Sequence, residues 1–222
     1  MSLAPDRRPV GGSYTFGGRQ GRMSPTRQRW FDELVPRYAL DQHGDIRAAV
    51  RERCLIVEIG CGKGDATAAM ADSDCASLVI ACEPNEATCA HLASLLDAAR
   101  ITNVKLWIGD AFDLLSTLGP ASVTEIRAWF PDPWPKPRHA HKRLVTPLRL
   151  GVIVDALVPS GMFRLASDAP DYAAEALAAI RAERRLHGGI VARPVERPVT
   201  VFEARGYREG RIAIDISAVR VV

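Results

Sequence analysis

The chain has 222 residues, of which 47% are hydrophobic and 25% are charged. This length is sufficient for one domain with a sizeable core, and the composition argues against global disorder. No apolar run reaches the roughly 18 residues that a membrane-spanning helix needs, and the first residues lack the apolar core of a signal peptide. We therefore expect a cytoplasmic protein without a membrane partner.

Positive charge is concentrated in two segments, although the net charge is only +3. Residues 1–29 and residues 133–149 each carry a net charge of +5, which leaves −7 for the rest of the chain. Two basic segments on an acidic body indicate a localised surface for a polyanion such as a nucleic acid. For each segment taken alone, a solvated run of charge is the alternative interpretation.

The chain begins with a segment that has no apolar periodicity. Residues 1–23 are rich in Gly, Arg and Pro, so we predict a flexible basic tail there and a single domain over residues 24–222. Ser24 followed by Pro25 is typical of a helix start, with the serine as N-cap. The short helix that follows presents three large apolar side chains: Trp30, Phe31 and Leu34.

Beyond Cys54, short apolar stretches alternate with longer helical ones. We predict strands over residues 54–59, 78–82, 104–108, 123–130 and 161–166. We predict helices over residues 63–71, 85–99, 111–118, 147–157 and 169–185. The alternation predicts an α/β fold with a mostly parallel sheet and helices on both faces. Residues 210–220 alternate in polarity and predict an antiparallel C-terminal strand at or near an edge.

A glycine-rich turn follows the first predicted strand. Gly60, Gly62 and Gly64 are spaced GxGxG, and Glu58 lies two residues before the first of them. A strand that runs through such a turn into a helix is typical of dinucleotide binding, but Asp65 stands where a nicotinamide fingerprint has its third glycine. The spacing favours a nucleoside that carries a sulfonium and an amino acid, namely S-adenosyl-L-methionine, with Glu58 near the cationic amino-acid end. Nicotinamide binding remains the alternative.

Acidic residues also follow the next two predicted strands. Glu83 lies 19 positions after Gly64, where a carboxylate can accept hydrogen bonds from both ribose hydroxyls. Asp110, followed by Ala111, is placed to accept from the adenine amino group. Either acid alone could simply cap a helix. Together with Glu58 they converge on the edge of a parallel sheet where ligands bind, and they predict a methyltransferase cofactor site.

The stretch from Trp129 to Arg143 interleaves prolines, aromatic residues and cations. Four prolines at alternate positions, from 131 to 137, exclude a helix and stiffen the backbone. This rigidity is expected to fix Asp132 and Trp134 beside the transferred methyl group. The interleaved composition is one that proteins use to hold a base and its phosphates, and a proline-stiffened surface loop is the alternative.

The same stretch resembles the signature of the bacterial tRNA (guanine-N7)-methyltransferases, which are class I methyltransferases. The resemblance implies a Rossmann-like α/β fold with a mostly parallel seven-stranded sheet, helices on both faces and an antiparallel C-terminal strand. Residues 19–24, Glu58–Gly64 and Thr200–Gly206 resemble that family as well, so the resemblance runs from about residue 19 to residue 217. In that family the substrate is the variable-loop guanosine at position 46 of tRNA. Departures are small: Pro137 and Ala140 stand where the family often has polar or basic residues.

The resemblance implies roles for individual residues. It implies that Glu58, Glu83, Asp110 and Asp132 bind the cofactor. It also implies that Lys136, Asp168 and the segment from Thr200 through Phe202 to Glu203 contact the substrate. The RNA would be held by the basic run, which contributes Arg138, His139, Lys142 and Arg143.

Guanine N7 is a hydrogen-bond acceptor with a free lone pair, so it needs no general base. Catalysis then depends on in-line positioning and on a carboxylate near the developing positive charge, and we predict Asp132 as the catalytic residue. Asp168 could accept from the N1 and N2 donors of guanine, which adenine lacks. A methylase of exocyclic amino groups and a noncatalytic RNA-binding protein on a methyltransferase scaffold remain open alternatives.

The cysteines do not indicate a metal site. None of the five forms a CxxC pair or a metal-type spacing with histidine, so we expect reduced thiols and no metal: Cys54, Cys61, Cys75, Cys82 and Cys89. His139 and His141 have no evident third ligand. The sequence is compatible with either a monomer or a homodimer.

Overall fold

The computed structural model describes residues 22–42, 44–50 and 54–221. Most of the predicted basic tail, including Arg7, Arg8 and Arg19, lies outside the described residues. The predicted helix start is confirmed: the Ser24 hydroxyl accepts a hydrogen bond from the Arg27 amide, and helix α1 covers Pro25–Glu33.

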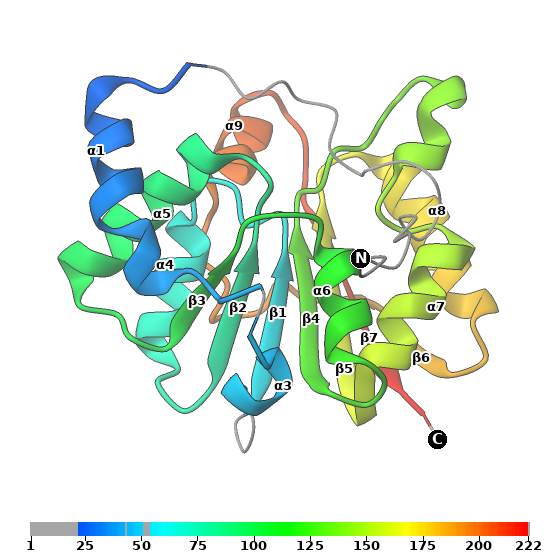
Figure 1. Ribbon diagram of the computed structural model, residues 1–222. Coiled ribbons are helices and arrows are strands. Elements are labelled where there is room, and N and C mark those ends of the chain that lie inside the picture. Colours follow the sequence, from blue (N-terminus) through cyan, green and yellow to red (C-terminus); the bar gives the residue numbers. More distant parts are fainter. Residues whose placement is uncertain (1–21, 43, 51–53, 222) are drawn as a thin grey trace.

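One seven-stranded sheet runs through the described residues, in the order β3-β2-β1-β4-β5-β7-β6 (Figure 1). The strands are β1 (Leu55–Ile59), β2 (Leu78–Cys82), β3 (Val104–Trp107), β4 (Val123–Trp129), β5 (Leu157–Ser167), β6 (Leu186–Val191) and β7 (Ile214–Arg220). Strands β1 to β5 pair in parallel, and β7 is antiparallel to both β5 and β6. The predicted mostly parallel sheet with an antiparallel C-terminal strand is therefore confirmed.

Helices cover both faces of the sheet (Figure 1). They are α1, α2 (Val35–Tyr38), α3 (Ile46–Ala49), α4 (Asp65–Ser73), α5 (Glu86–Ala99), α6 (Ala111–Leu118), α7 (Pro147–Ala156), α8 (Pro170–Ala182) and α9 (Val201–Arg208), with a 3-10 helix η1 (Pro137–Lys142).

Two apolar clusters fill the space between the helices and the sheet. Helices α6, α7 and α8 pack on one face, against residues such as Val57 of β1 and Phe163 of β5. Helices α1, α2 and α5 pack on the other face, against residues such as Ile56 of β1 and Val79 of β2. Because alternate side chains of a strand point to opposite faces, Ile56 and Val57 reach different clusters.

The sheet order places a topological switch between β1 and β4. From β1 the chain moves outward through β2 to β3, and it returns to the other side of β1 for β4 and then β5. In sheets of this kind the crevice at the carboxyl ends of the two central strands is the usual place for a ligand. The loops after β1 and β4 therefore border the expected ligand-binding crevice.

The short helices α2 and α3 were not predicted, several element ends shift by a few residues, and four larger differences concern β5, β6, α9 and η1. Strand β5 begins at Leu157 rather than at 161, because a register shift with β4 and the left-handed Ser160 (φ 64°) let the strand continue through a bend. Strand β6 was not predicted, because Gly188 and Gly189 and an exposed edge position erase its alternation. Helix α9 was not predicted either. The expectation that the proline run excludes a helix is wrong from Pro137 onward, since proline is well tolerated as the first residue of η1.

Candidate functional site

The loop between β1 and α4 depends on glycine at three positions. Gly60, Gly62 and Gly64 have φ values of 72°, 56° and 80°, a region that side chains with a Cβ disfavour. A Cβ at Gly60 or Gly62 would meet nothing within 4 Å. A Cβ at Gly64 would lie 2.3 Å from Cδ1 of Leu92, in helix α5. The first two glycines therefore border open space, and the third allows α4 and α5 to pack closely.

That open space is a cavity of about 770 Å³ at the carboxyl ends of the central strands. Its volume is in the range of pockets that enclose a cofactor or a drug-sized ligand. All the residues predicted to bind the cofactor line it: Glu58, Gly60, Gly62, Gly64, Glu83, Asp110, Ala111 and Asp132. Three of the residues predicted to contact substrate also line it: Lys142, Thr200 and Phe202.

The cavity lining is acidic. It contains five carboxylates, from Glu58, Asp65, Glu83, Asp110 and Asp132, and two ammonium groups, from Lys63 and Lys142. A concave surface with this balance attracts a cation. A ligand with a sulfonium and an α-amino group fits both the charge and the glycine-lined space.

Glu58 is held by a partner that the sequence analysis did not identify. Its carboxylate accepts hydrogen bonds from Thr67 Oγ1 at 3.0 Å and from Arg127 Nε at 3.1 Å. Arg127 sits opposite Glu58 in the β1–β4 register, and both side chains are at most 3% exposed. The one signal in the sequence was an arginine inside the apolar strand β4. Glu58 therefore links α4 to β4 through these hydrogen bonds, and it also lines the cavity.

Glu83 and Asp110 are oriented by the loops that follow their strands. Glu83 accepts a hydrogen bond from the Asn85 amide at 2.9 Å. Burial raises the pKa of Glu83, the hydrogen bonds from the Asn85 and Gly62 amides oppose this shift, and the charge of Asp132 adds to it. Asp110 caps α6 by accepting from the Phe112 amide at 2.9 Å. Each carboxylate is thus fixed by backbone donors while it lines the cavity.

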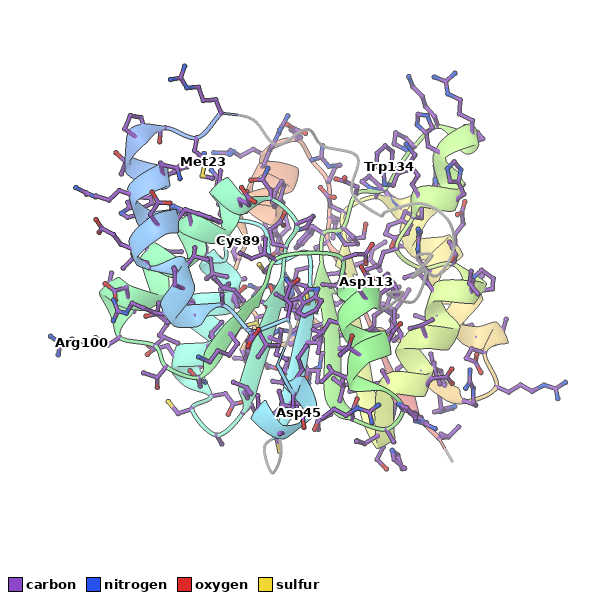
Figure 2. All side chains as sticks on the ribbon, viewed as in Figure 1. Met23, Asp45, Cys89, Arg100, Asp113 and Trp134 are labelled. Atoms are coloured by element: carbon purple, nitrogen blue, oxygen red, sulfur yellow. The ribbon has the colours of Figure 1, made fainter. Side chains whose placement is uncertain are left out.

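The loop after β4, which carries the proline run, contains two strained residues. Phe130 and Trp134 have φ values of 55° and 42°, which are unfavourable for non-glycine residues. Between them lies Asp132, which is exposed and lines the cavity. Figure 2 shows Trp134 at the carboxyl end of the strands, the end opposite Asp45. Such strain is typical of functional sites, where the surrounding structure fixes an unfavourable backbone.

The aromatic ring of Trp134 organises part of the basic run. Lys142 Nζ lies 4.8 Å from the centre of that ring, and His139 contacts it edge-on with centroids 5.6 Å apart. Arg138 donates from Nε to His139 Nε2 at 3.4 Å. Lys136 and Arg138 are exposed, so their cationic groups face outward from η1 and its approach.

Two arginines of the basic run point inward. Arg143 was predicted to hold RNA together with the rest of this run, and the structure places its side chain inside the fold, only 8% exposed. It donates to the carbonyl oxygens of Pro133 and Trp134, at 2.9 and 3.2 Å, and forms an ion pair with Glu175. Arg149 donates in turn to the carbonyl oxygen of Arg143 at 2.6 Å. The two guanidinium groups stabilise the loop by donating hydrogen bonds to its carbonyl oxygens, which need donors where water is excluded.

The late predicted residues divide between the cavity and its surroundings. Thr200 caps α9 by accepting from the Glu203 amide at 3.0 Å, and Phe202 is 63% exposed at the cavity wall. Glu203, predicted to contact substrate, is fully buried and bonded to Arg197 instead, so the structure gives it a role inside the fold. Asp168 is not part of the cavity lining, and its carboxylate accepts from Arg211 Nε at 2.7 Å.

Two kinds of feature are absent from the described residues. Over residues 22–42, 44–50 and 54–221, no group of three or more His, Cys, Asp or Glu side chains is arranged to hold a metal ion. Within the same described part of the chain, no helix is both long and apolar enough to cross a membrane. The five cysteines are all free thiols.

Comparison with known proteins connects this site to one family. Residues 52–216 match the family described as "Putative methyltransferase". A tRNA (guanine-N(7)-)-methyltransferase of Nocardioides sp. is 36% identical over 226 residues, covering 97% of this chain and 90% of that protein. One of Xanthomonas campestris pv. campestris is 37% identical over 212 residues, covering 91% of this chain and 81% of that protein.

Solved structures share the fold at low sequence identity. The 16S rRNA methyltransferase KamB superposes with a TM-score of 0.59 at 15% identity, covering 83% of this chain and 95% of that one. An rRNA methylase from Streptococcus thermophilus gives a TM-score of 0.54 at 14% identity, covering 80% and 93%. These neighbours agree with the class I methyltransferase fold that was predicted. Because the sequence match extends over nearly the whole chain, this protein belongs to the tRNA (guanine-N(7)-)-methyltransferase family.

Proposed function

We propose that this protein transfers a methyl group from S-adenosyl-L-methionine to N7 of the guanosine at variable-loop position 46 of tRNA. The observation that carries the proposal is the acidic cavity at the switch point, bordered by the rigid Asp132 loop and by outward-facing cations of the same loop. The family to which the chain belongs supports both the reaction and the tRNA substrate. We propose that residues 24–222 act as one domain, and that the protein works in the cytoplasm, to which its free thiols are suited.

The cofactor would be held by groups that the structure has already ordered. S-adenosyl-L-methionine supplies an electrophilic methyl group on a sulfonium. Gly60 and Gly62 leave room for it, and Glu83, which lines the same cavity, is assigned to the ribose hydroxyls. Asp110 and Ala111 border the end of the cavity assigned to adenine. Glu58 is assigned to the amino-acid end, with Arg127 fixing its orientation.

On the substrate side, the residues position the base and need not remove a proton. Guanine N7 carries a free lone pair, so its attack requires alignment and a favourable electrostatic environment. Asp132 provides negative charge where the product base becomes cationic. Asp168 follows β5, next to β4 in the sheet, and is assigned to the guanine N1 and N2 donors, for which it must exchange its ion pair with Arg211.

The RNA backbone would meet the outward-facing cations of the basic run. Lys136 and Arg138 supply the exposed charge, and Lys142, which is half-buried beside the Trp134 ring and lines the cavity, adds a cation at its rim, with His139 close to the same ring. Phosphate contacts of this kind do not depend on sequence and weaken steeply with salt. Thr200 and Phe202 also line the cavity, where the exposed Phe202 ring offers a stacking surface for a base.

The test is to incubate the protein with labelled cofactor and unmodified tRNA, then identify the methylated nucleoside by mass analysis. We expect N7-methylguanosine, and its loss when the variable-loop guanosine is replaced by adenosine. A methylated exocyclic amine, or failure of the protein to bind S-adenosylmethionine in calorimetry, would refute the proposal.

The role of Asp132 has its own test. We expect Asp132→Ala to lower turnover by at least ~100-fold, equivalent to about 2.7 kcal/mol, with the melting temperature retained. Asp72→Ala is the matched control, because Asp72 is exposed on α4 and is not part of the cavity lining. Wild-type turnover in a folded Asp132→Ala protein would remove this carboxylate from the mechanism.

A further inference from the structure

A fully buried arginine lies beneath the cavity, next to the walls assigned to substrate. Arg197 is 0% exposed, and its guanidinium donates four hydrogen bonds to two carboxylates. Two of them reach Glu203 of α9, at 2.7 and 3.1 Å, and two reach Asp215 of β7, at 3.0 and 2.9 Å. We refer to Arg197, Glu203 and Asp215 as the Arg197 cluster.

Together with Arg193, the cluster is balanced in charge, and its carboxylates are satisfied in hydrogen bonds. Arg193 forms a second ion pair with Glu203 at 3.2 Å, and the Tyr207 hydroxyl donates to the same carboxylate at 2.8 Å. Two cations therefore face two anions. Buried ions are costly unless they are paired and hydrogen-bonded in this way. Even a well-paired buried cluster adds little net stability, so stability alone does not explain this one.

One side of the cluster contacts the end of β4. The Arg197 guanidinium carbon lies 5.6 Å from the centre of the Trp129 ring and 5.4 Å from that of the Phe130 ring. Both rings line the cavity, and Phe130 is the strained residue that begins the loop to Asp132. Such cation–π contacts stabilise a ring in place when the cation is desolvated.

The other side of the cluster holds α9. The first residues of this helix and its cap form a cavity wall, made by Thr200, Val201 and Phe202. Yet the only buried residues of α9 are Glu203 and Gly206, so the helix has no buried apolar side chain to attach it. Most helices are held by an apolar face. Here the ion pairs of Glu203 with Arg197 take that place.

We infer that Arg197 is a positioning residue that fixes the α9 wall against the Trp129–Phe130 wall, and so sets the substrate side of the cavity. The inference rests on the proposed function, because it assigns these two walls to the methylated base. Arg197 has no contact with the glycine loop, Glu83 or Asp110 among the hydrogen bonds and ring contacts described above. Cofactor binding and methyl transfer should therefore separate when the cluster is altered.

The test uses the full chain with Arg197→Lys, which keeps the charge but cannot make the four hydrogen bonds or the planar contact with the rings. We expect amide hydrogen exchange in residues 200–208 to accelerate by at least about 10-fold, with no change in α4 and α5. Affinity for S-adenosylhomocysteine should stay within about 3-fold, while single-turnover methyl transfer to tRNA falls by roughly 100-fold. Arg197→Met should show the same pattern more strongly if it folds, and Arg197→Lys decides if it does not.

Arg164→Lys is the matched control. Arg164 lies on the neighbouring strand β5, is 20% exposed and pairs with Glu125 and Glu196, none of which lines the cavity. It should leave exchange in α9 and methyl transfer unchanged. The inference is overturned if Arg197→Lys behaves like this control, or if it weakens cofactor binding and methyl transfer equally.

The two proposals fail in different ways. If the wild-type protein does not methylate tRNA, the proposed function is wrong, whereas hydrogen exchange still reports whether Arg197 holds α9. If the wild type is active but exchange in α9 does not respond to Arg197→Lys, the positioning role is wrong and the function stands.

Discussion

The glycine loop provides a prediction in which stability and ligand binding separate between two neighbouring residues. Gly62 and Gly64 both have a left-handed backbone, so alanine at either position carries a conformational cost of roughly 1–2 kcal/mol. Their surroundings differ. A Cβ at Gly62 meets nothing within 4 Å, whereas one at Gly64 would overlap Cδ1, Cβ and Cγ of Leu92, at 2.3, 2.8 and 2.8 Å.

The overlap at Gly64 cannot be relieved cheaply. Leu92 is 0% exposed and belongs to the apolar cluster beneath α5, so its side chain has no free volume to enter. Overpacking of this kind costs typically about 1–3 kcal/mol. We therefore expect Gly64→Ala to lower the free energy of unfolding by roughly 2–5 kcal/mol in total, and Gly62→Ala by only the backbone term of roughly 1–2 kcal/mol.

The assay is thermal unfolding of both variants without ligand, followed by calorimetric titration with S-adenosylhomocysteine. For a domain of this size, each kcal/mol of stability shifts the melting temperature by roughly 2–4 °C. The two variants differ by about 1–3 kcal/mol, so Gly64→Ala should melt roughly 2–12 °C below Gly62→Ala. Gly62→Ala should instead lose at least about 10-fold in affinity, because its methyl group enters the space assigned to the ligand. Equal melting temperatures would refute the packing argument, and wild-type affinity in Gly62→Ala would refute the placement of the ligand.

Three further predictions concern charge. The pKa of Glu83 is raised above its ordinary value of 4.5 by burial, so protonation on acidification stabilises the folded apo protein but removes an acceptor. Affinity for S-adenosylhomocysteine should therefore fall as the pH drops through this raised pKa, and Glu83→Gln should show weak binding without that pH dependence; an equally pH-dependent Glu83→Gln protein would contradict the assignment. Arg143→Met should lower the free energy of unfolding by about 1.5–3 kcal/mol, because it removes charged donors from buried carbonyl groups. Arg138→Met should leave the melting temperature unchanged and reduce the salt dependence of tRNA binding by about one phosphate contact. A normal melting temperature for Arg143→Met would contradict its structural role, and an unchanged salt slope for Arg138→Met would contradict its contact with a phosphate.

Much of the fold could be predicted because its signals are local. The cap at Ser24, the glycine turn after β1 and the acids after β2 and β3 each act within a few residues of where they occur in the chain. Parallel strands bring the ends of such segments together without further information, so the eight predicted cofactor residues line one cavity. The sequence by itself thus determined the five parallel strands, the C-terminal strand and the position of a cavity lined by the eight residues proposed to bind the cofactor.

The partners of the buried charges were decided only by the tertiary structure. Arg127 pairs with Glu58 from β4, a strand that is distant along the chain but adjacent in the sheet. Arg197 pairs with Asp215 of β7, which follows α9 in the chain. Its position in a basic run predicts that Arg143 is exposed. In the fold its side chain is buried and forms an ion pair with Glu175 of α8. A charge in a sequence indicates only what it can bind, because burial and the choice of partner depend on residues that are distant along the chain.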